Sequence, residues 1–249
     1  PQSYVVVGGG PAGMEAARVL ATAGHRVTLF ERTPELGGQI KLAAMPPGKD
    51  KIKWTTDYLE TQIRKLGVEI HLNTDVNADS LQAMDADGII LATGAAPLIP
   101  DIPGAHSPNV TNAWDVLGGK YQVGNKVIIV GGGNVGCETG LFLKQRGADV
   151  TVIEMEDEIA VDTEPISRMH LLAELRKNEV TVLTGLNVRE IKHDGVVAMD
   201  SCWHEKWFPC TNVVFSVGAT PVNHLETQLL QRGKRVYVIG DARQPRKLN

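Results

Sequence analysis

A strand, a glycine-rich turn, a helix and a second strand ending in a carboxylate follow one another within residues 4–31, and this stretch constrains the fold most. Residues 4–7 (YVVV) are an uninterrupted apolar run, typical of a parallel strand buried on both faces. Gly8, Gly10 and Gly13 then fill the pattern G-x-G-x-x-G. In this pattern the first glycine permits a tight turn, the second lets a pyrophosphate approach the backbone, and the third lets the helix pack on its strand.

The residues after the turn complete the arrangement. Residues 12–23 predict a helix whose free N–H groups and positive dipole end face phosphates, and Gly24 is expected to end it in a left-handed cap. Glu31 lies 18 residues after Gly13, where an acidic side chain accepts hydrogen bonds from ribose hydroxyls. We therefore interpret residues 4–31 as a nucleotide cradle, the first cradle, against the alternative of an ordinary glycine-rich turn.

The same arrangement recurs in the second half of the chain, within residues 126–154. Residues 126–130 predict a strand and residues 135–146 a helix, and Glu154 lies 18 residues after the last glycine, as in the first copy. The repeated glycines are Gly131, Gly133 and Gly136. Two copies with equal spacing predict an α/β fold with two Rossmann-like dinucleotide-binding domains. Residues 126–154 are the second cradle.

Four prolines within residues 95–108 break any regular pattern and mark a boundary between the two domains. We expect a first domain over residues 1–107, a second over residues 108–217, and a return to the first over residues 218–249. The second domain is then inserted in the first.

The rest of the first domain alternates between helix and strand patterns. Residues 52–66 and 78–84 predict helices, and residues 68–72 and 88–92 predict strands. Residues 43–50 (AAMPPGKD) predict an irregular connector, because two consecutive prolines cannot lie inside a helix.

In the second domain the periodicity changes along the chain. Residues 164–178 predict an amphipathic helix, with its apolar positions at Ile166, Met169, Leu172 and Leu175. The short alternating segments 188–191, 196–199 and 205–208 predict an antiparallel meander laid over the parallel sheet, with a turn at Asp194-Gly195.

Composition excludes several classes of function. The chain has 249 residues, of which 43% are hydrophobic, so it can build a sizeable core. Its formal net charge of −4 and the lack of Lys/Arg clusters argue against binding to nucleic acid. No apolar run approaches the roughly 20 residues that span a bilayer. The N-terminus leads directly into a strand without a signal peptide, so we expect a cytoplasmic protein with no membrane partner.

The cysteines and histidines indicate no metal or dithiol site. Cys137, Cys202 and Cys210 are odd in number, scattered and never arranged as C-x-x-C, which argues against a redox dithiol, an iron–sulfur cluster or a zinc site. The seven histidines are also dispersed. We therefore predict no metal ligands, and no motif marks a catalytic side chain.

Several further motifs add a family resemblance that covers nearly the whole chain. The two glycine patterns, a strand running into Ala-Thr-Gly at residues 92–94 and a strand ending in Gly-Asp at residues 240–241 together resemble the two-dinucleotide-domain flavoprotein reductases. LGGQ (36–39), PPGK (46–49) and VIGDARQPRK (238–247) are most similar to the C-terminal half of the NADH:flavin oxidoreductases related to 2,4-dienoyl-CoA reductase and trimethylamine dehydrogenase. In that family a flavin barrel with an iron–sulfur cluster precedes this half.

The resemblance implies that the first cradle holds FAD and the second holds a nicotinamide dinucleotide beside the flavin. It places the Gly-Asp pair by the ribityl and pyrophosphate groups and the Val76 backbone at the adenine. The cofactor-binding residues implied for FAD are Gly8, Gly10, Pro11, Ala12, Gly13, Glu31, Arg32, Gly38, Gln39, Val76, Thr93, Gly94, Gly240 and Asp241. Those implied for the second cradle are Gly131, Gly133, Asn134, Val135, Gly136 and Glu154, and Gly218, which ends a strand as Gly94 does, joins the cofactor-binding set.

Two functions are compatible with these patterns. In the first, NADH passes hydride to FAD, and the electrons leave for an acceptor outside this chain, either a missing N-terminal flavin and iron–sulfur domain or a separate partner. In the second, the chain is a non-catalytic module that binds ADP within a larger flavoenzyme. Thioredoxin reductases share the layout but carry a C-x-x-C pair that this chain lacks, so we expect Cys137 to serve in helix packing.

Overall fold

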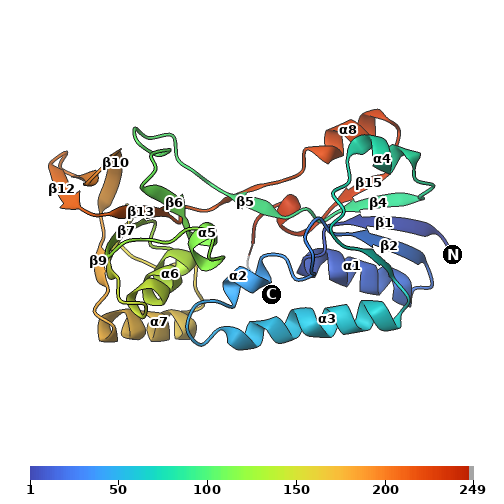
Figure 1. Ribbon diagram of the computed structural model, residues 1–249, viewed down its shortest axis with the longest axis horizontal. Helices are drawn as coiled ribbons and strands as arrows, with labels where there is room; N and C mark the ends of the chain where they lie inside the picture. Colours follow the sequence, from blue (N-terminus) through green and yellow to red (C-terminus); the bar gives the residue numbers. More distant parts are fainter. Residues whose placement is uncertain (247–249) are drawn as a thin grey trace. The chain divides into compact units, whose positions relative to one another are not determined.

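The computed structural model describes residues 1–246, and its chain divides into two compact units (Figure 1). Unit 1 comprises Pro1–Ala44, Asp50–Ala96 and the chain from Ala219 onward, and unit 2 comprises Met45–Lys49 and Pro97–Gly218. The chain thus passes from unit 1 to unit 2 between Ala96 and Pro97. The prolines predict this boundary later, at residue 107. The reason is packing, because the apolar residues of the proline-rich segment join the core of unit 2. These are Ile99, Ile102 and Ala105.

Unit 1 is built on a five-stranded parallel sheet with the strand order β15-β4-β1-β2-β3. The strands are β1 (Ser3–Val7), β2 (Arg26–Phe30), β3 (Glu69–His71), β4 (Gly88–Leu91) and β15 (Val236–Val238). The last strand pairs with β4, so the end of the chain completes a sheet that the beginning of the chain started.

Helices cover both faces of this sheet, as Figure 1 shows. They are α1 (Pro11–Thr22), α3 (Lys53–Lys65), α4 (Ala78–Ala83) and α8 (Leu225–Gln231). Because successive strand residues point to opposite faces, the central strand β1 serves two cores. Val6 packs with Met14 of α1 and Ile63 of α3, whereas its neighbours in β1 pack with Leu81 of α4 and Leu229 of α8. The result is a three-layer, doubly wound unit.

Unit 2 repeats the parallel sheet and covers one face differently. Its strand order is β6-β13-β7-β8-β9. The strands are β6 (Val110–Asn112), β7 (Lys126–Val130), β8 (Asp149–Ile153), β9 (Thr181–Leu183) and β13 (Asn212–Phe215). An antiparallel sheet of β10 (Leu186–Lys192), β11 (Gly195–Asp200) and β12 (Glu205–Pro209) packs on one face, where Ile128 and Phe215 meet Val188 and Val196. The predicted meander is therefore present, although its first turn is His193-Asp194 and Gly195 already belongs to β11.

Helix α6 (Asn134–Lys144) fills most of the other layer of unit 2, and α7 (Pro165–Lys177) packs beside it. The predicted apolar stripe of α7 is wrong at two positions, since Ile166 is 73% exposed and Met169 is 68% exposed. The buried face is instead a narrow one formed by Leu171 and Leu175, one turn apart.

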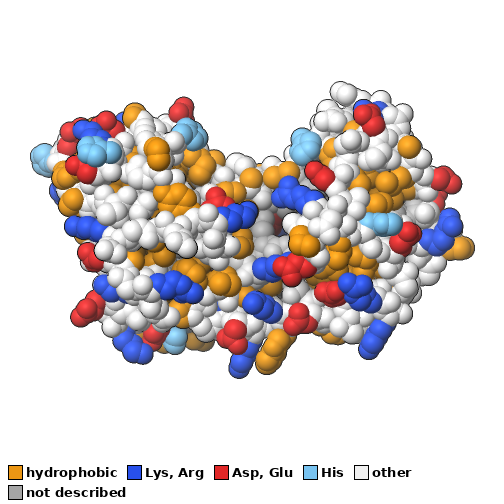
Figure 2. All heavy atoms as spheres, viewed as in Figure 1, with side chains coloured by type: hydrophobic (Ala, Val, Ile, Leu, Met, Phe, Trp, Pro, Cys, Tyr) orange, Lys and Arg blue, Asp and Glu red, His pale blue; other side chains and the backbone are white. Residues whose placement is uncertain are grey.

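Short elements complete the two units. Helices α2 (Ile40–Ala43), α5 (Ala113–Leu117) and α8 and the strand pair β5 (Ala95–Pro97) and β14 (Ala219–Pro221) have too few residues for a periodic pattern. Figure 2 shows acidic and basic side chains interspersed over the visible face, with no basic patch that would fit nucleic acid. Within residues 1–246 no helix is long and apolar enough to cross a membrane.

Leu229 tests the packing of α8, because its side chain is fully buried whereas that of the adjacent Leu230 is 53% exposed. We expect Leu229→Ala to lower the free energy of unfolding by about 2–5 kcal/mol through the cavity it leaves. Leu230→Ala on the same helix should change it by less than about 0.5 kcal/mol. Urea denaturation followed by circular dichroism measures both, and equal effects would contradict the assigned face of α8.

Candidate dinucleotide-binding sites

The two glycine turns have the same construction. Gly8 and Gly131 lie at the ends of β1 and β7 with φ values of 108° and 105°. A Cβ atom at either position would collide with a carbonyl oxygen of the neighbouring strand's end, Ala92 in unit 1 and Ser216 in unit 2. Both the backbone conformation and the packing therefore require glycine.

The first turn of each following helix is packed directly against its glycine turn. A Cβ at Gly13 would collide with the Gly8 carbonyl oxygen, and a Cβ at Gly136 would collide with that of Gly131. This contact brings the N-terminus of each helix to the carboxyl end of its sheet, where the first N–H groups have no acceptor within the helix. Each cradle thus presents backbone donors and a positive helix end to the outside.

The middle motif glycines leave space that the protein does not fill. Gly10 and Gly133 have extended backbones (φ −74° and −65°) that any residue adopts. The atom nearest to a Cβ at Gly10 is 3.9 Å away, in Gly38, and at Gly133 it is 3.7 Å away, in Asp162. Because neither conformation nor internal packing demands glycine here, the open space fits the close approach of a phosphate from outside.

The carboxylate of Glu31 is held against the first turn. Glu31 is only 7% exposed, and its Oε2 accepts a hydrogen bond from the Gly9 N–H at 2.7 Å. Its Oε1 accepts from the Thr33 N–H at 2.8 Å and from the Thr33 hydroxyl at 2.7 Å. The carboxylate is therefore fixed at the end of β2, and with three of its roughly four lone-pair sites in use it has one left for a ribose hydroxyl.

Glu154 repeats this arrangement in the second cradle. Its Oε2 accepts from the Gly132 N–H at 2.6 Å, and its Oε1 accepts from the Glu156 N–H at 2.9 Å. A Cβ at Gly132 would lie 2.9 Å from the Cβ of Glu154, and one at Gly9 would lie 3.0 Å from the bound carboxylate oxygen. The sequence analysis did not include Gly9 or Gly132, although the run of three glycines in both copies was the signal.

Two distant segments border the first cradle, as the sequence predicts. A Cβ at Gly38 would lie 3.0 Å from the Gly10 Cα, so the LGGQ loop is packed against the turn. A Cβ at Gly240 would lie 2.6 Å from the Ala12 side chain, so the Gly-Asp segment reaches the start of α1. Asp241, next to Gly240, accepts a hydrogen bond from the Arg246 N–H at 3.1 Å.

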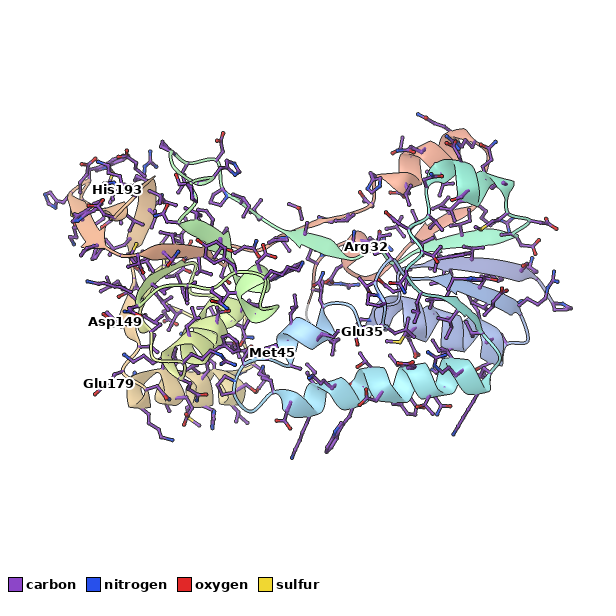
Figure 3. All side chains as sticks on the ribbon, in the orientation of Figure 1. Arg32, Glu35, Met45, Asp149, Glu179 and His193 are labelled. Atoms are coloured by element: carbon purple, nitrogen blue, oxygen red, sulfur yellow. The ribbon has the colours of Figure 1, made fainter. Side chains whose placement is uncertain are left out.

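The remaining residues predicted for FAD have less direct positions. The Thr93 hydroxyl donates to the Val222 carbonyl. Gly94, between β4 and β5, has a φ of 74°. Val76 buries its side chain in the core of unit 1, which leaves only its backbone for an adenine. Arg32 is exposed just beyond β2 (Figure 3). The ligand roles of these residues stay predictions.

A polar network surrounds the start of α6 in the second cradle. The Asn134 N–H donates to Asp162 Oδ1 at 2.9 Å, and the Asn134 side chain accepts from the Thr163 hydroxyl at 3.0 Å and donates to Glu138 at 2.9 Å. Lys49 of the PPGK connector pairs with the largely buried Glu138 at 2.6 Å. This ion pair compensates the buried charge, and it ties the connector to unit 2. No sequence motif marks Glu138 or Asp162, and Lys49 stands out only as part of PPGK, without a role.

Two predicted residues of unit 2 lie outside this network. Val135 is 43% exposed in the first turn of α6. Gly218 has a φ of 111° with open space around it. Neither position conflicts with a ligand, and their roles stay predictions.

Cys137 is a packing residue of α6, in agreement with its expected role. Its side chain is fully buried, and its Sγ donates to the Gly132 carbonyl at 3.3 Å. Burial raises the pKa of the Cys137 thiol to about 12, and the carboxylates of Asp162, Glu138 and Glu154 add to the rise. The thiol is therefore protonated at neutral pH and unsuited to nucleophilic or redox chemistry.

In the part of the chain that the structure describes, no three His, Cys, Asp or Glu side chains are grouped to hold a metal ion.

Substitutions at Gly10 and Gly13 should distinguish an effect on ligand binding from an effect on folding stability. We expect Gly10→Ala to leave the thermal midpoint nearly unchanged, because its Cβ meets no atom closer than 3.9 Å, while it obstructs a phosphate. Gly13→Ala should lower the midpoint strongly, since its Cβ would strike the Gly8 carbonyl. Thermal unfolding and chromatography of nucleotide released on denaturation measure the two effects. Full nucleotide retention by Gly10→Ala would contradict the proposed phosphate position.

Comparisons with known proteins agree with this geometry. A family model described as pyridine nucleotide-disulphide oxidoreductase matches residues 2–246. The NADH oxidase of Thermoanaerobacter brockii is 43% identical over 97% of this chain and 38% of that protein. The cinnamate reductase of Clostridium sporogenes is 36% identical over 97% of this chain and 36% of that protein.

Solved structures give the same result. A 2-naphthoyl-CoA reductase complex superimposes with a TM-score of 0.94 and 33% identity, covering 99% of this chain and 37% of that one. The chain thus spans well under half the length of these relatives, and the match lies in their FAD- and NAD-binding half. The predicted α/β fold and family resemblance are confirmed. The chain belongs to the pyridine nucleotide-disulphide oxidoreductase family, whose members bind FAD and NAD(P)H.

Proposed function

We propose that this chain is the electron-input unit of a flavoenzyme, which passes hydride from NADH to FAD and electrons onward to an acceptor outside the chain. The family assignment supports an oxidoreductase with a flavin and a nicotinamide nucleotide. The observation that carries the finer proposal is the duplicated cradle, with a held carboxylate in each copy.

The segments around each cradle support the assignment of its cofactor. The first cradle is bordered by LGGQ and by the returning Gly240, so it offers contacts along an extended ligand such as FAD. In the second cradle Glu154 is less buried than Glu31, and Val135 at the start of its helix is 43% exposed. That difference favours a retained cofactor in the first cradle and an exchanging one in the second.

In this proposal the side chains of both cradles position the cofactors and do not perform acid–base chemistry. A bound flavin supplies the acceptor for hydride from a reduced nicotinamide, which needs no protein acid or base. Glu31 and Glu154, each oriented by two backbone N–H groups, would fix the two riboses. The helix ends beside them would bind the pyrophosphates.

The variety of the relatives supports an acceptor outside the chain. Proteins named NADH oxidase, bilirubin reductase and metal reductase all match nearly the whole of this chain, which covers 37–42% of their lengths. Their named activities differ while the matched stretch is shared. A common step of electron input in this stretch, with the final acceptor bound elsewhere, accounts for both facts.

The nucleotide that the chain retains tests this function. The purified chain, denatured without prior addition of nucleotide, should release FAD, which chromatography of the supernatant identifies. NADH should bleach the flavin absorbance before denaturation and support slow reduction of an artificial acceptor. Release of ADP alone would favour the non-catalytic nucleotide-binding module instead, and stoichiometric turnover of an enoyl-CoA or amine by this chain would overturn the external acceptor.

Glu154 should make the second cradle prefer NADH over NADPH. The 2′-phosphate of NADPH would lie beside its carboxylate, and two anions that close repel by roughly 1–4 kcal/mol. We expect kcat/KM for flavin reduction to be at least about fivefold higher with NADH. Glu154→Gln should narrow that ratio, whereas Glu156→Gln, an exposed neighbour whose side chain lies outside the proposed contact, should preserve it. Comparable kcat/KM for both nucleotides in the unchanged chain would refute this role of Glu154.

A further inference from the structure

The loop that follows the held carboxylate is built alike in the two cradles. In each unit a backbone N–H six residues beyond the carboxylate donates to a carbonyl of the glycine turn. In unit 1 Gly37 donates to Gly9, and in unit 2 Ala160 donates to Gly132. These hydrogen bonds measure 2.9 and 2.7 Å. Both residues have a positive φ, 115° for Gly37 and 51° for Ala160. The two loops can therefore be compared residue by residue.

The loops differ at the second position after this contact, where unit 1 has Gln39 and unit 2 has Asp162. The neutral Gln39 side chain turns away from its helix and donates to the Ala95 carbonyl at 3.2 Å. Asp162 turns toward its helix, accepts from the Asn134 N–H at 2.9 Å, and lies with both carboxylate oxygens within 3.8 Å of a Cβ built on Gly133. A carboxylate thus lies at the edge of the space that Gly133 leaves open.

That space is where an incoming pyrophosphate would bind. A helix N-terminus attracts one anion to its free N–H groups, and the same N–H cannot serve Asp162 and a phosphate together. Two anions at this distance also repel each other. The first cradle has no such conflict, because its helix begins with Pro11, which has no N–H, and its loop has a neutral amide.

We propose that Asp162 is an internal competitor for the pyrophosphate of the nicotinamide dinucleotide, hydrogen-bonded to the start of α6 and displaced from it when the dinucleotide binds. This inference rests on the proposed function, in which the second cradle takes NADH. A competing carboxylate lowers the apparent affinity and eases release, as suits a substrate that must exchange at every turnover.

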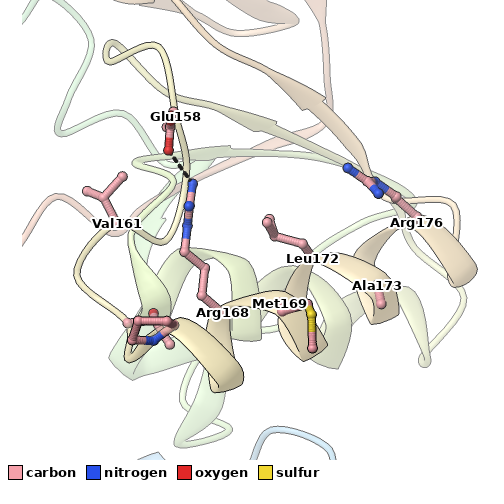
Figure 4. A pocket seen from close by; sticks show the side chains of 9 residues that line it. Glu158, Val161, Arg168, Met169, Leu172, Ala173 and Arg176 are labelled. Carbon is pink, nitrogen blue, oxygen red and sulfur yellow. Dashed lines mark hydrogen bonds and ion pairs between the residues drawn. The ribbon is translucent and has the colours of Figure 1, made fainter.

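The Asp162 side chain is exposed, so it can move away from α6. Its neighbours Val161 and Thr163 line a pocket of about 620 Å³ along α7 (Figure 4). The start of the loop is fixed, since Arg168 pairs with Glu158 at 2.6 Å and donates to the Ile159 carbonyl at 3.0 Å. Movement can therefore be confined to the segment around Asp162.

Asp162→Asn tests the competition, because it keeps the shape of the side chain and removes its charge. Asp157→Asn on the same loop is the matched control, since it changes the net charge equally at an exposed position away from α6. We expect Asp162→Asn to lower the Kd for NADH by roughly two- to fivefold, the range of a charge at an exposed helix terminus. Asp157→Asn should leave the Kd unchanged. Calorimetric titration with NADH under anaerobic conditions measures these values, on the FAD-loaded chain whose flavin has been reduced beforehand so that no hydride is transferred.

Thermal unfolding separates competition from a purely structural cap. Under competition, Asp162→Asn lowers the Tm of the chain without NADH but leaves the Tm of the NADH-saturated chain unchanged, because the contact is already broken there. A lower Tm in both states, with an unchanged Kd, would overturn the competition and leave Asp162 as a cap. Failure of both the unchanged chain and the variant to bind NADH would instead overturn the proposed function, and the competition with it.

Discussion

Both sites depend on one steric constraint. Where the first turn of each helix contacts its glycine turn, there is no room for a side chain. The contacts of Gly13 with Gly8 and of Gly136 with Gly131 leave no room for a Cβ. They set the helix end at the carboxyl edge of the sheet, and the turn N–H then reaches the carboxylate at the end of the next strand. Sheet, helix end and acidic side chain are thus fixed together by one steric condition.

With that framework shared, the differences between the cradles lie in the side chains of the surrounding loops. Unit 1 borders its cradle with glycines and a neutral amide, Gly38 and Gln39. Unit 2 gathers charge at the same place, with Asp162 on the helix end and the buried Glu138 paired with Lys49. The two cradles therefore share one backbone design and differ in the charge of the loops around it.

The parts of the structure that follow from local chemistry could be predicted from the sequence. The turns and helices of both cradles and the positions of Glu31 and Glu154 depend on residues close together in the chain. Long-range packing could not be predicted in the same way. The face of α7 that is buried is the one that packs against α6. Met169 lies on another face and is exposed, although its spacing in the sequence predicts burial. The Lys49–Glu138 pair joins a proline-rich connector to a helix far along the chain, and neither segment carries a motif for it.

The insertion of one unit in the other also has a consequence for how the chain folds. Apart from Met45–Lys49, unit 2 is continuous from Pro97 to Gly218, so its sheet can form as soon as that segment has been synthesised. Unit 1 must wait, because β15 is the partner of β4 and lies near the end of the chain. Until β15 arrives, the apolar strand β4 is an open edge with unpaired backbone groups, and such edges pair readily with other chains. Between the synthesis of β4 and of β15 this edge is therefore open to such pairing.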